Sequence, residues 1–141
     1  WPATRIAGGE YSDSRAFDWR GCGRADVFSL SPFHGNVLQM HRRSECGWQT
    51  YVIRDDLEFG HVVWAGQLLG RPGLIVGSRR GRCEVRLLRS RDEAGTEFIE
   101  YTLGEGIGAA QMIVVNTGPP IAQLLITARD KRKVLLIEIT E

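Results

Sequence analysis

The stretch Trp48-Gln-Thr-Tyr-Val-Ile53 returns 50 residues later as Phe98-Ile-Glu-Tyr-Thr-Leu103. A looser form of the same phrase, Trp1-Pro-Ala-Thr-Arg-Ile6, opens the chain 47 residues before Trp48. Each copy begins with an aromatic residue and continues with β-branched or aromatic side chains, which are enriched in β-strands. Strand-like phrases that recur at such a period predict stacked or circularly arranged repeats.

A second phrase recurs at nearly the same interval. Its copies, which follow one another after 48 and 49 residues, are Val37-Leu-Gln-Met40, Val85-Arg-Leu-Leu88 and Val134-Leu-Leu-Ile137. Because both phrases keep one spacing, we expect a single segment over residues 1–141 that contains three repeats. The repeats run roughly over residues 1–47, 48–97 and 98–141.

The central repeat contains four short runs of β-branched, aromatic and leucine residues, separated by Gly, Pro and charged clusters. The runs are Gln49–Ile53, His61–Leu68, Gly73–Arg79 and Glu84–Ser90. None of them sustains the spacing of an amphipathic helix. Four antiparallel strands per repeat of about this length are typical of a β-propeller blade. We therefore expect an all-β fold of about three four-stranded antiparallel blades.

The order of the runs predicts how the blades begin and end. We assign the strand headed by Trp48 as the outermost strand of the preceding blade, which leaves residues 1–6 as an outer strand without its own blade. The last blade then lacks an outer strand. Natural propellers use roughly four to eight blades. We expect either part of a larger propeller or self-association, with another copy or a partner chain completing the ring. The start at Trp1 also suggests a processed piece or a fragment.

Composition excludes several classes of partner. The formal net charge is +1, from 18 basic and 17 acidic residues, so we expect neither a nucleic-acid nor a membrane partner. No run approaches the roughly 18 apolar residues of a membrane-spanning helix. Three cysteines form no C-x-x-C pair, which favours a reducing, cytoplasmic compartment. We expect Cys22, Cys46 and Cys83 to act as partly buried, small apolar residues.

Antiparallel strand order also predicts which loops share one end of the blades. It places Glu58–His61 beside Gly77–Gly81, with Ser31–Asn36 and Thr127–Lys131 at the same end of the neighbouring blades. We therefore expect several chemically useful side chains to converge there: His34, His61, Asn36, Arg79, Arg80 and Arg129. The third histidine, His41, lies among arginines near a strand end and is expected at the surface.

These residue types suggest two kinds of chemistry. His34 and His61 could ligate one divalent metal ion or transfer a proton as catalytic groups. Arginines and Asn36 could bind anionic or carbonyl groups of a ligand through forked hydrogen bonds. Equally, the histidines could be loop-packing residues and the arginines a solvated rim. No third metal ligand is fixed by spacing, although Glu58, Glu105 and Asp130 belong to the same loops.

Several phrases resemble a known repeat family. Gly23-Arg-Ala-Asp-Val-Phe28, Gly70-Arg-Pro-Gly-Leu-Ile-Val-Gly77 and Val85-Arg-Leu-Leu88 are similar to degenerate FG-GAP and VCBS propeller repeats. The fuller repeats carry an acidic calcium loop between the first two strands. The corresponding stretches here lack that run of acidic residues, so we do not expect calcium in the blades; they are Asp18–Gly23, Gly66–Gly70 and Val115–Pro119.

Other phrases resemble the propeller of the aldos-2-ulose dehydratase group and its uncharacterised bacterial relatives. They are Ser31-Pro-Phe-His-Gly-Asn36, Phe59-Gly-His-Val-Val-Trp64 and Gly77-Ser-Arg-Arg-Gly81. This resemblance implies a sugar-derived ketone as substrate and a lyase reaction, with His34 and His61 as metal or acid–base groups. The enzymes of that group carry further domains that have no counterpart in this sequence.

Two functions follow for the predicted site. One is part of a carbohydrate lyase that binds a sugar or sugar-derived ketone and removes a proton next to its carbonyl group. The other is a non-catalytic module, a lectin or an interaction scaffold, that binds a glycan or a protein. A lectin propeller is expected to repeat its binding residues in every blade, whereas His34 aligns with arginines in the other repeats. This asymmetry favours a single site.

Overall fold

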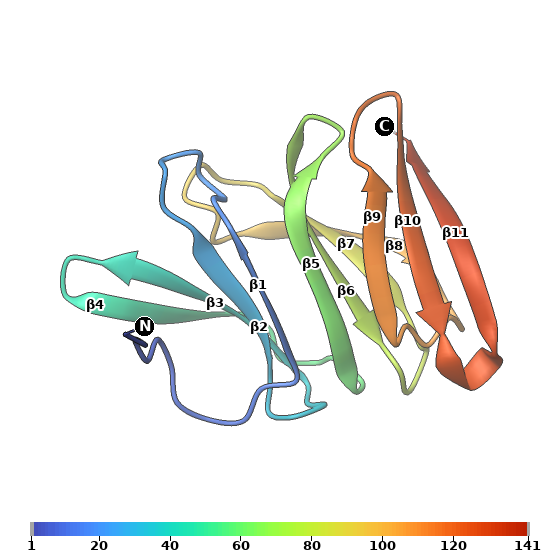
Figure 1. Ribbon diagram of the computed structural model, residues 1–141, viewed down its shortest axis with the longest axis horizontal. Coiled ribbons are helices and arrows are strands. Elements are labelled where there is room, and N and C mark those ends of the chain that lie inside the picture. The colour runs from blue at the N-terminus through green and yellow to red at the C-terminus, as the bar shows by residue number, and fades with distance from the viewer. Residues whose placement is uncertain (1, 141) are drawn as a thin grey trace.

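In the computed structural model, which describes residues 2–140, the protein is all-β and forms three antiparallel sheets (Figure 1). Sheet one contains β1 (Asp13–Phe17), β2 (Asp26–Ser31), β3 (Val37–Ser44) and β4 (Gly47–Arg54). Sheet two contains β5 (Gly60–Leu68), β6 (Arg71–Ser78), β7 (Val85–Ser90) and β8 (Phe98–Gly104). Sheet three contains β9 (Gln111–Asn116), β10 (Ile121–Ala128) and β11 (Lys133–Thr140). Between β10 and β11 lies a 3-10 turn, Arg129–Lys131. No helix within residues 2–140 is long and apolar enough to cross a membrane.

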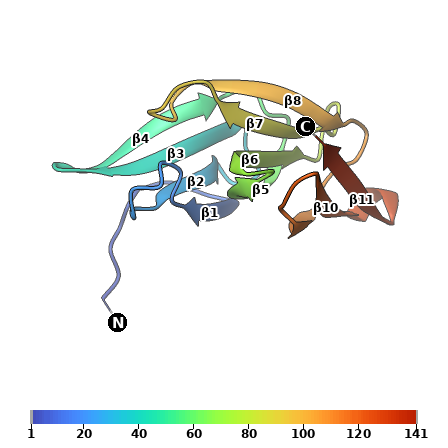
Figure 2. The ribbon, with the colours of Figure 1, turned by 90° about the horizontal axis from the view of Figure 1, so that it is seen from above.

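The strand order within each sheet agrees with the sequence. Strands are hydrogen-bonded in chain order, so the aromatic-headed strands β4 and β8 are the last strands of sheets one and two. They lie on the opposite side of the molecule from β1 and β5 (Figure 2). The all-β class and the antiparallel pairing are therefore confirmed, while sheet three has three strands in the described part of the chain.

The expected strand at the start of the chain is not formed. Residues 2–12 contain no strand, and Trp1 lies outside the described residues. Gly8 and Gly9 lie in this segment, and glycine disfavours extended pairing. Tyr11 instead folds back, donating a hydrogen bond to the Gly8 carbonyl at 3.3 Å and packing edge-on against His41 of sheet one. The prediction of an outer strand over residues 1–6 was therefore wrong for residues 2–6.

The core consists of two apolar layers, one between each pair of neighbouring sheets. Alternation along β6 supplies both layers, because successive side chains of a strand point to opposite faces. Leu74 and Val76 pack towards sheet one, while Ile75 packs towards sheet three. The first layer also contains Phe28, Leu30, Leu38, Met40, Val63 and Leu88, and the second contains Val85, Leu87, Leu124, Ile126 and Ile139.

Polar side chains are also buried in the core, and two cysteines lie outside it. The guanidinium of Arg42 donates to both carboxylate oxygens of Asp26, at 3.0 and 2.8 Å, and to the carbonyl of Ala94 at 2.6 Å. This contact ties sheet one to the β7–β8 loop. His41 is buried, only 1% exposed, and its ring nitrogens contact Ser29 and Thr50, so the prediction of a surface position was wrong. Cys22 and Cys46 are exposed and free, so the expectation of partial burial was wrong for both.

Candidate functional site

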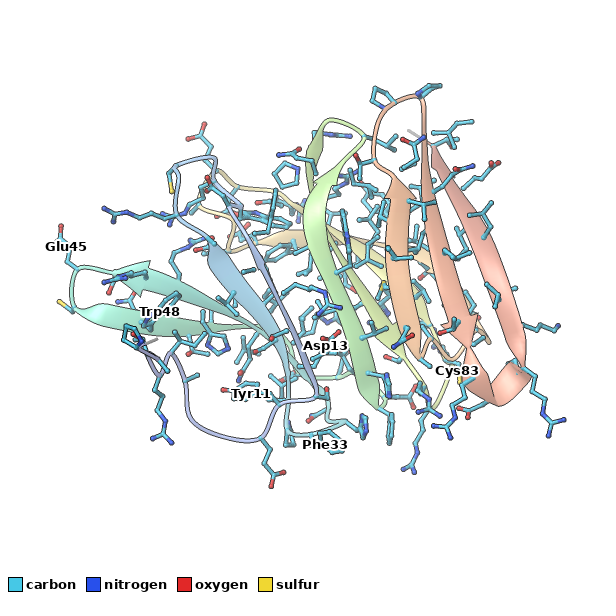
Figure 3. The ribbon with its side chains drawn as sticks, in the orientation of Figure 1. Tyr11, Asp13, Phe33, Glu45, Trp48 and Cys83 are labelled. Carbon is cyan, nitrogen blue, oxygen red and sulfur yellow. The ribbon has the colours of Figure 1, made fainter. Side chains whose placement is uncertain are left out.

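Backbone hydrogen bonds bring three loops together at one end of sheets one and two. Gly60 donates to the Gly35 carbonyl at 2.8 Å, which joins the start of β5 to the β2–β3 loop. Arg79 and Arg80 donate to the carbonyls of Phe59 and Glu58 at 3.0 and 3.1 Å. These bonds confirm the predicted position of Glu58–His61 beside Gly77–Gly81. In Figure 3 this end is the lower edge of the molecule, where Phe33 and Cys83 are labelled.

An ion pair adds the β10–β11 turn to the same end. The Arg79 guanidinium donates to both carboxylate oxygens of Asp130, with three contacts between 2.8 and 3.2 Å. Arg79 belongs to sheet two and Asp130 to sheet three, so the contact connects two sheets. The guanidinium lowers the pKa of the Asp130 carboxyl, because an adjacent cation favours the ionised form.

The centre of the site is a stack of flat side chains. The His34 ring is 4.6 Å from the Phe59 ring and 4.7 Å from the His61 ring, with an interplanar angle of 10° in both pairs. Phe59 and His61 are themselves nearly parallel, with centroids 6.2 Å apart. These three distances place Phe59 and His61 side by side, with His34 lying across both. The Arg80 guanidinium lies 4.7 Å from the centre of the Phe59 ring.

Unusual backbone geometry positions the stacked rings. His34 has φ 54° and Phe59 has φ 63°, in the left-handed region that side-chain-bearing residues rarely adopt. His61 has no cross-strand partner, because the register against β6 shifts between Gly60 and Val62. A bulge of this kind redirects a side chain, and such bulges are common beside functional sites. Local strain is retained only where surrounding contacts hold it in place.

Both histidines of the stack keep a buried nitrogen without a partner. The Nδ1 atoms of His34 and His61 are inaccessible, and they neither donate nor accept a hydrogen bond within the part of the chain that the structure describes. Burial, followed by the positive charge of Arg79, lowers the pKa of the His61 imidazole below its ordinary value. Neutral His61 therefore predominates at pH 7, which leaves an imidazole able to accept a proton.

Two adjoining depressions open beside His61. The first, of about 450 Å³, is lined by His61, Arg79, Ala110, Gln111, Thr127 and Arg129. The second, of about 550 Å³, runs across β1, β5 and β9 and also includes Asp13, Arg15 and Ile113. Asp13, the first residue of β1 (Figure 3), accepts a hydrogen bond from the Val63 amide of β5 at 3.0 Å. Volumes of this size suit a small polar ligand.

The predicted site residues play different parts in this arrangement. His61, Arg79 and Arg129 line one depression, while His34 and Arg80 flank it through the ring stack. Asn36 uses its side-chain amide to donate to the Asp55 carbonyl at 2.6 Å, so it supports the loop.

The geometry does not favour a metal ion held by both histidines. An imidazole binds a metal through a lone pair in its ring plane, and the planes of His34 and His61 are nearly parallel. Their lone pairs therefore lie in separate, stacked planes and do not converge. Within residues 2–140 no group of three or more His, Cys, Asp or Glu side chains could hold a metal. Glu58, one candidate third ligand, accepts a hydrogen bond from the Arg82 amide at 3.2 Å.

Sequence reasoning missed three members of the site. Phe59 completes the stack, Asp13 joins β1 to β5, and Arg15 lines the second depression. Phe59 precedes a glycine at a strand start, which signals a turn but not a ring contact. Asp13 and Arg15 carried no signal, because their position depends on how sheet one packs against sheet two.

Comparisons with known proteins found no relative: no protein-family model, curated protein or solved structure matches this chain.

Proposed function

We propose that the protein is a ligand-binding β-propeller segment that takes a sugar or sugar-derived ketone into the depressions beside His61. The observation that carries the proposal is the His34–Phe59–His61 stack, with its two buried Nδ1 atoms, at the edge of an arginine-lined depression. Gln111 and Thr127 line both depressions and offer hydrogen-bond groups to ligand hydroxyls. Flat rings are also suited to the apolar faces of sugars.

The chemistry that this site supports best is proton abstraction next to a carbonyl group. Neutral His61 would accept the proton, and a neighbouring guanidinium would stabilise the negative charge that develops on the carbonyl oxygen. The hydroxyl group on the adjacent carbon would then leave as water by taking the proton back from the His61 imidazolium. The electron pair of the broken carbon–hydrogen bond would form a carbon–carbon double bond, which completes a lyase reaction of the dehydratase type. The resemblance to the aldos-2-ulose dehydratase group supports the same substrate class. No metal ion is needed for this step.

The alternative is a non-catalytic module that binds a glycan or a protein at the same place. The stack and the depressions would serve this function equally well, since neither requires a reaction. Because His34 and His61 have no counterparts in the other sheets, this module would have one site rather than one in each sheet.

The propeller part of the proposal rests on how the sheets repeat. In sheet two, Ile75, Val85 and Leu87 are buried against sheet three. The corresponding residues of sheet three are Leu125, Val134 and Leu136, and Val134 and Leu136 are 65% and 55% exposed. The apolar face of sheet two is therefore covered by sheet three, whereas the matching face of sheet three is exposed to solvent. A further sheet packed against sheet three would bury it, as in successive propeller blades.

We infer that a second copy of the chain supplies this further sheet. In each copy β11 has an unpaired edge, and residues 2–7 form no strand, so one copy can add its first residues beside β11 of the other. Two copies would provide about six sheets, within the range of natural propellers. Completion by a partner chain is the alternative, and a measurement of the mass of the purified chain in solution distinguishes the two.

Incubation with keto-sugars tests the catalytic function. Formation of an unsaturated carbonyl product is followed by its ultraviolet absorbance, and binding is followed separately by calorimetry. His61→Gln is expected to bind the sugar while losing turnover at least about a hundredfold, whereas Lys131→Gln, in the nearby turn, keeps both. Binding without turnover in the native protein would favour the non-catalytic module. Absence of binding to neutral and acidic sugars alike would refute the proposal.

A further inference from the structure

The charges around the first depression are unequal, although the whole chain is nearly neutral. Arg79 is paired with Asp130, whereas Arg80 contacts the Phe59 ring and Arg129 makes no ion pair within residues 2–140. Glu58, another carboxylate in these loops, accepts a hydrogen bond from the Arg82 amide. Among residues 2–140, Arg80 and Arg129 therefore have no carboxylate partner at this end of the molecule.

The second depression does not supply the missing negative charge. Its carboxylate, Asp13, already accepts hydrogen bonds from Arg15 at 2.8 Å and from the Val63 amide at 3.0 Å. After burial, the positive charge of Arg79 is the next cause of the lowered pKa of His61, and it outweighs the opposing effect of Asp13. A cleft lined by one sign of charge concentrates ligands of the opposite sign.

Arg129 has the best position to contact a charged ligand. It begins the turn Arg129–Lys131, lies exposed, and lines the same depression as His61. The Arg79–Asp130 pair fixes this turn against sheet two, so the Arg129 backbone is held while its guanidinium is free to form a forked contact.

We propose that the ligand is a sugar acid whose carboxylate binds Arg129, with its hydroxyl-bearing body beside His61, Gln111 and Thr127. This inference rests on the proposed function, because the site must first bind a sugar-like molecule. It adds the charge of the ligand and the residue that recognises it. It also gives the ligand an orientation, with the anionic end towards the β10–β11 turn and the reacting carbon towards His61.

Nuclear magnetic resonance titration provides the test, because the chain has 3 histidines whose imidazole signals can be followed together. Glucuronate and neutral methyl glucoside are the probes, and sodium acetate and inorganic phosphate are the anion controls. The signals of His34 and His61 are assigned with His34→Gln and His61→Gln. His41 lies in sheet one and serves as the internal control.

We expect glucuronate to shift the His34 and His61 signals and to bind at least about tenfold more tightly than methyl glucoside. Arg129→Gln should remove this preference, whereas Lys131→Gln, in the same turn, should keep it. An unshifted His41 signal in both variants shows that sheet one remains folded. Raising the salt concentration should weaken glucuronate binding more than methyl glucoside binding.

Four results would overturn the inference, and the last of them would overturn the proposed function as well. Equal affinities for the two sugars would refute the charge preference but leave the proposed function standing. Equal loss of preference in Arg129→Gln and Lys131→Gln would show a diffuse basic surface instead of a contact with Arg129. Acetate or phosphate binding as tightly as glucuronate would show an anion site that ignores the sugar. If neither sugar shifts His34 or His61, the proposed function fails, and the inference fails with it.

Discussion

At the scale of single residues, the lowered pKa of His61 predicts how stability depends on pH. His41 also has a lowered pKa, caused by burial. Below the ordinary histidine pKa of about 6.5, the two imidazoles bind protons in the unfolded chain but stay neutral in the native protein. The free energy of unfolding should therefore be level above that pH and fall as the pH decreases from about 6.5 to 5. Urea unfolding across this range measures the slope, and His61→Gln should reduce it. An unchanged slope would contradict neutral His61.

The buried pair between Arg42 and Asp26 makes a second prediction at this scale. The side chains are 10% and 1% exposed, and Arg20 is the other cation near Asp26, at 3.7 Å. Arg42→Leu leaves the buried carboxylate nearly uncompensated and should lower the free energy of unfolding by about 3 kcal/mol. Its exposed neighbour provides the matched variant Arg43→Leu, for which we expect a change below about 0.5 kcal/mol. Equal effects in urea unfolding would show that the pair contributes little.

At the scale of elements, the β2–β3 loop depends on Gly35. A Cβ atom added there would approach the Pro32 nitrogen to 2.5 Å and the Ser31 carbonyl oxygen to 2.6 Å. Both are backbone atoms, so the loop itself must move. Gly35→Ala should destabilise the protein by about 1–3 kcal/mol and displace His34 from the stack. The expected readout is a changed His34 and His61 signal in the magnetic resonance spectrum.

Gly8→Ala is the control for this substitution. No atom lies within 4 Å of the position that its Cβ would take, so stability and both histidine signals should remain as in the native protein. If Gly35→Ala also leaves the two histidine signals unchanged, the loop is adaptable and does not fix the stack.

The existence and order of the strands were predictable from the sequence, whereas the conformation of the N-terminal residues was not. Strands β5, β6 and β7 match the predicted runs because each is a short apolar stretch bounded by turn residues. The loop end shared by His34 and His61 followed from antiparallel order alone. The prediction for the first residues was wrong because an aromatic residue at the head of a segment is typical of a strand, but a strand forms only where a neighbouring strand offers an edge for pairing. Tyr11 instead found a contact on sheet one.

At the scale of the whole molecule, the open face of sheet three predicts self-association. Light scattering should give the mass of two or more copies, rising with protein concentration. Leu136→Lys places a charge in the centre of the apolar face and should shift the equilibrium towards one copy. Tyr101→Lys replaces another exposed apolar residue, on β8, and should leave the mass unchanged. A single copy at all concentrations would instead favour completion by a partner chain.

The sequence by itself determined the all-β class, the repeat and the end of the sheets where the site residues meet. Those features depend on local strand preference, on turn residues and on the regular reversal of antiparallel strands, all of which are encoded over short distances. Only the tertiary structure decided that His34 lies across both Phe59 and His61, that Asp130 neutralises Arg79, and that Arg129 makes no ion pair within residues 2–140. These contacts join residues from different sheets, and their geometry depends on how the sheets pack.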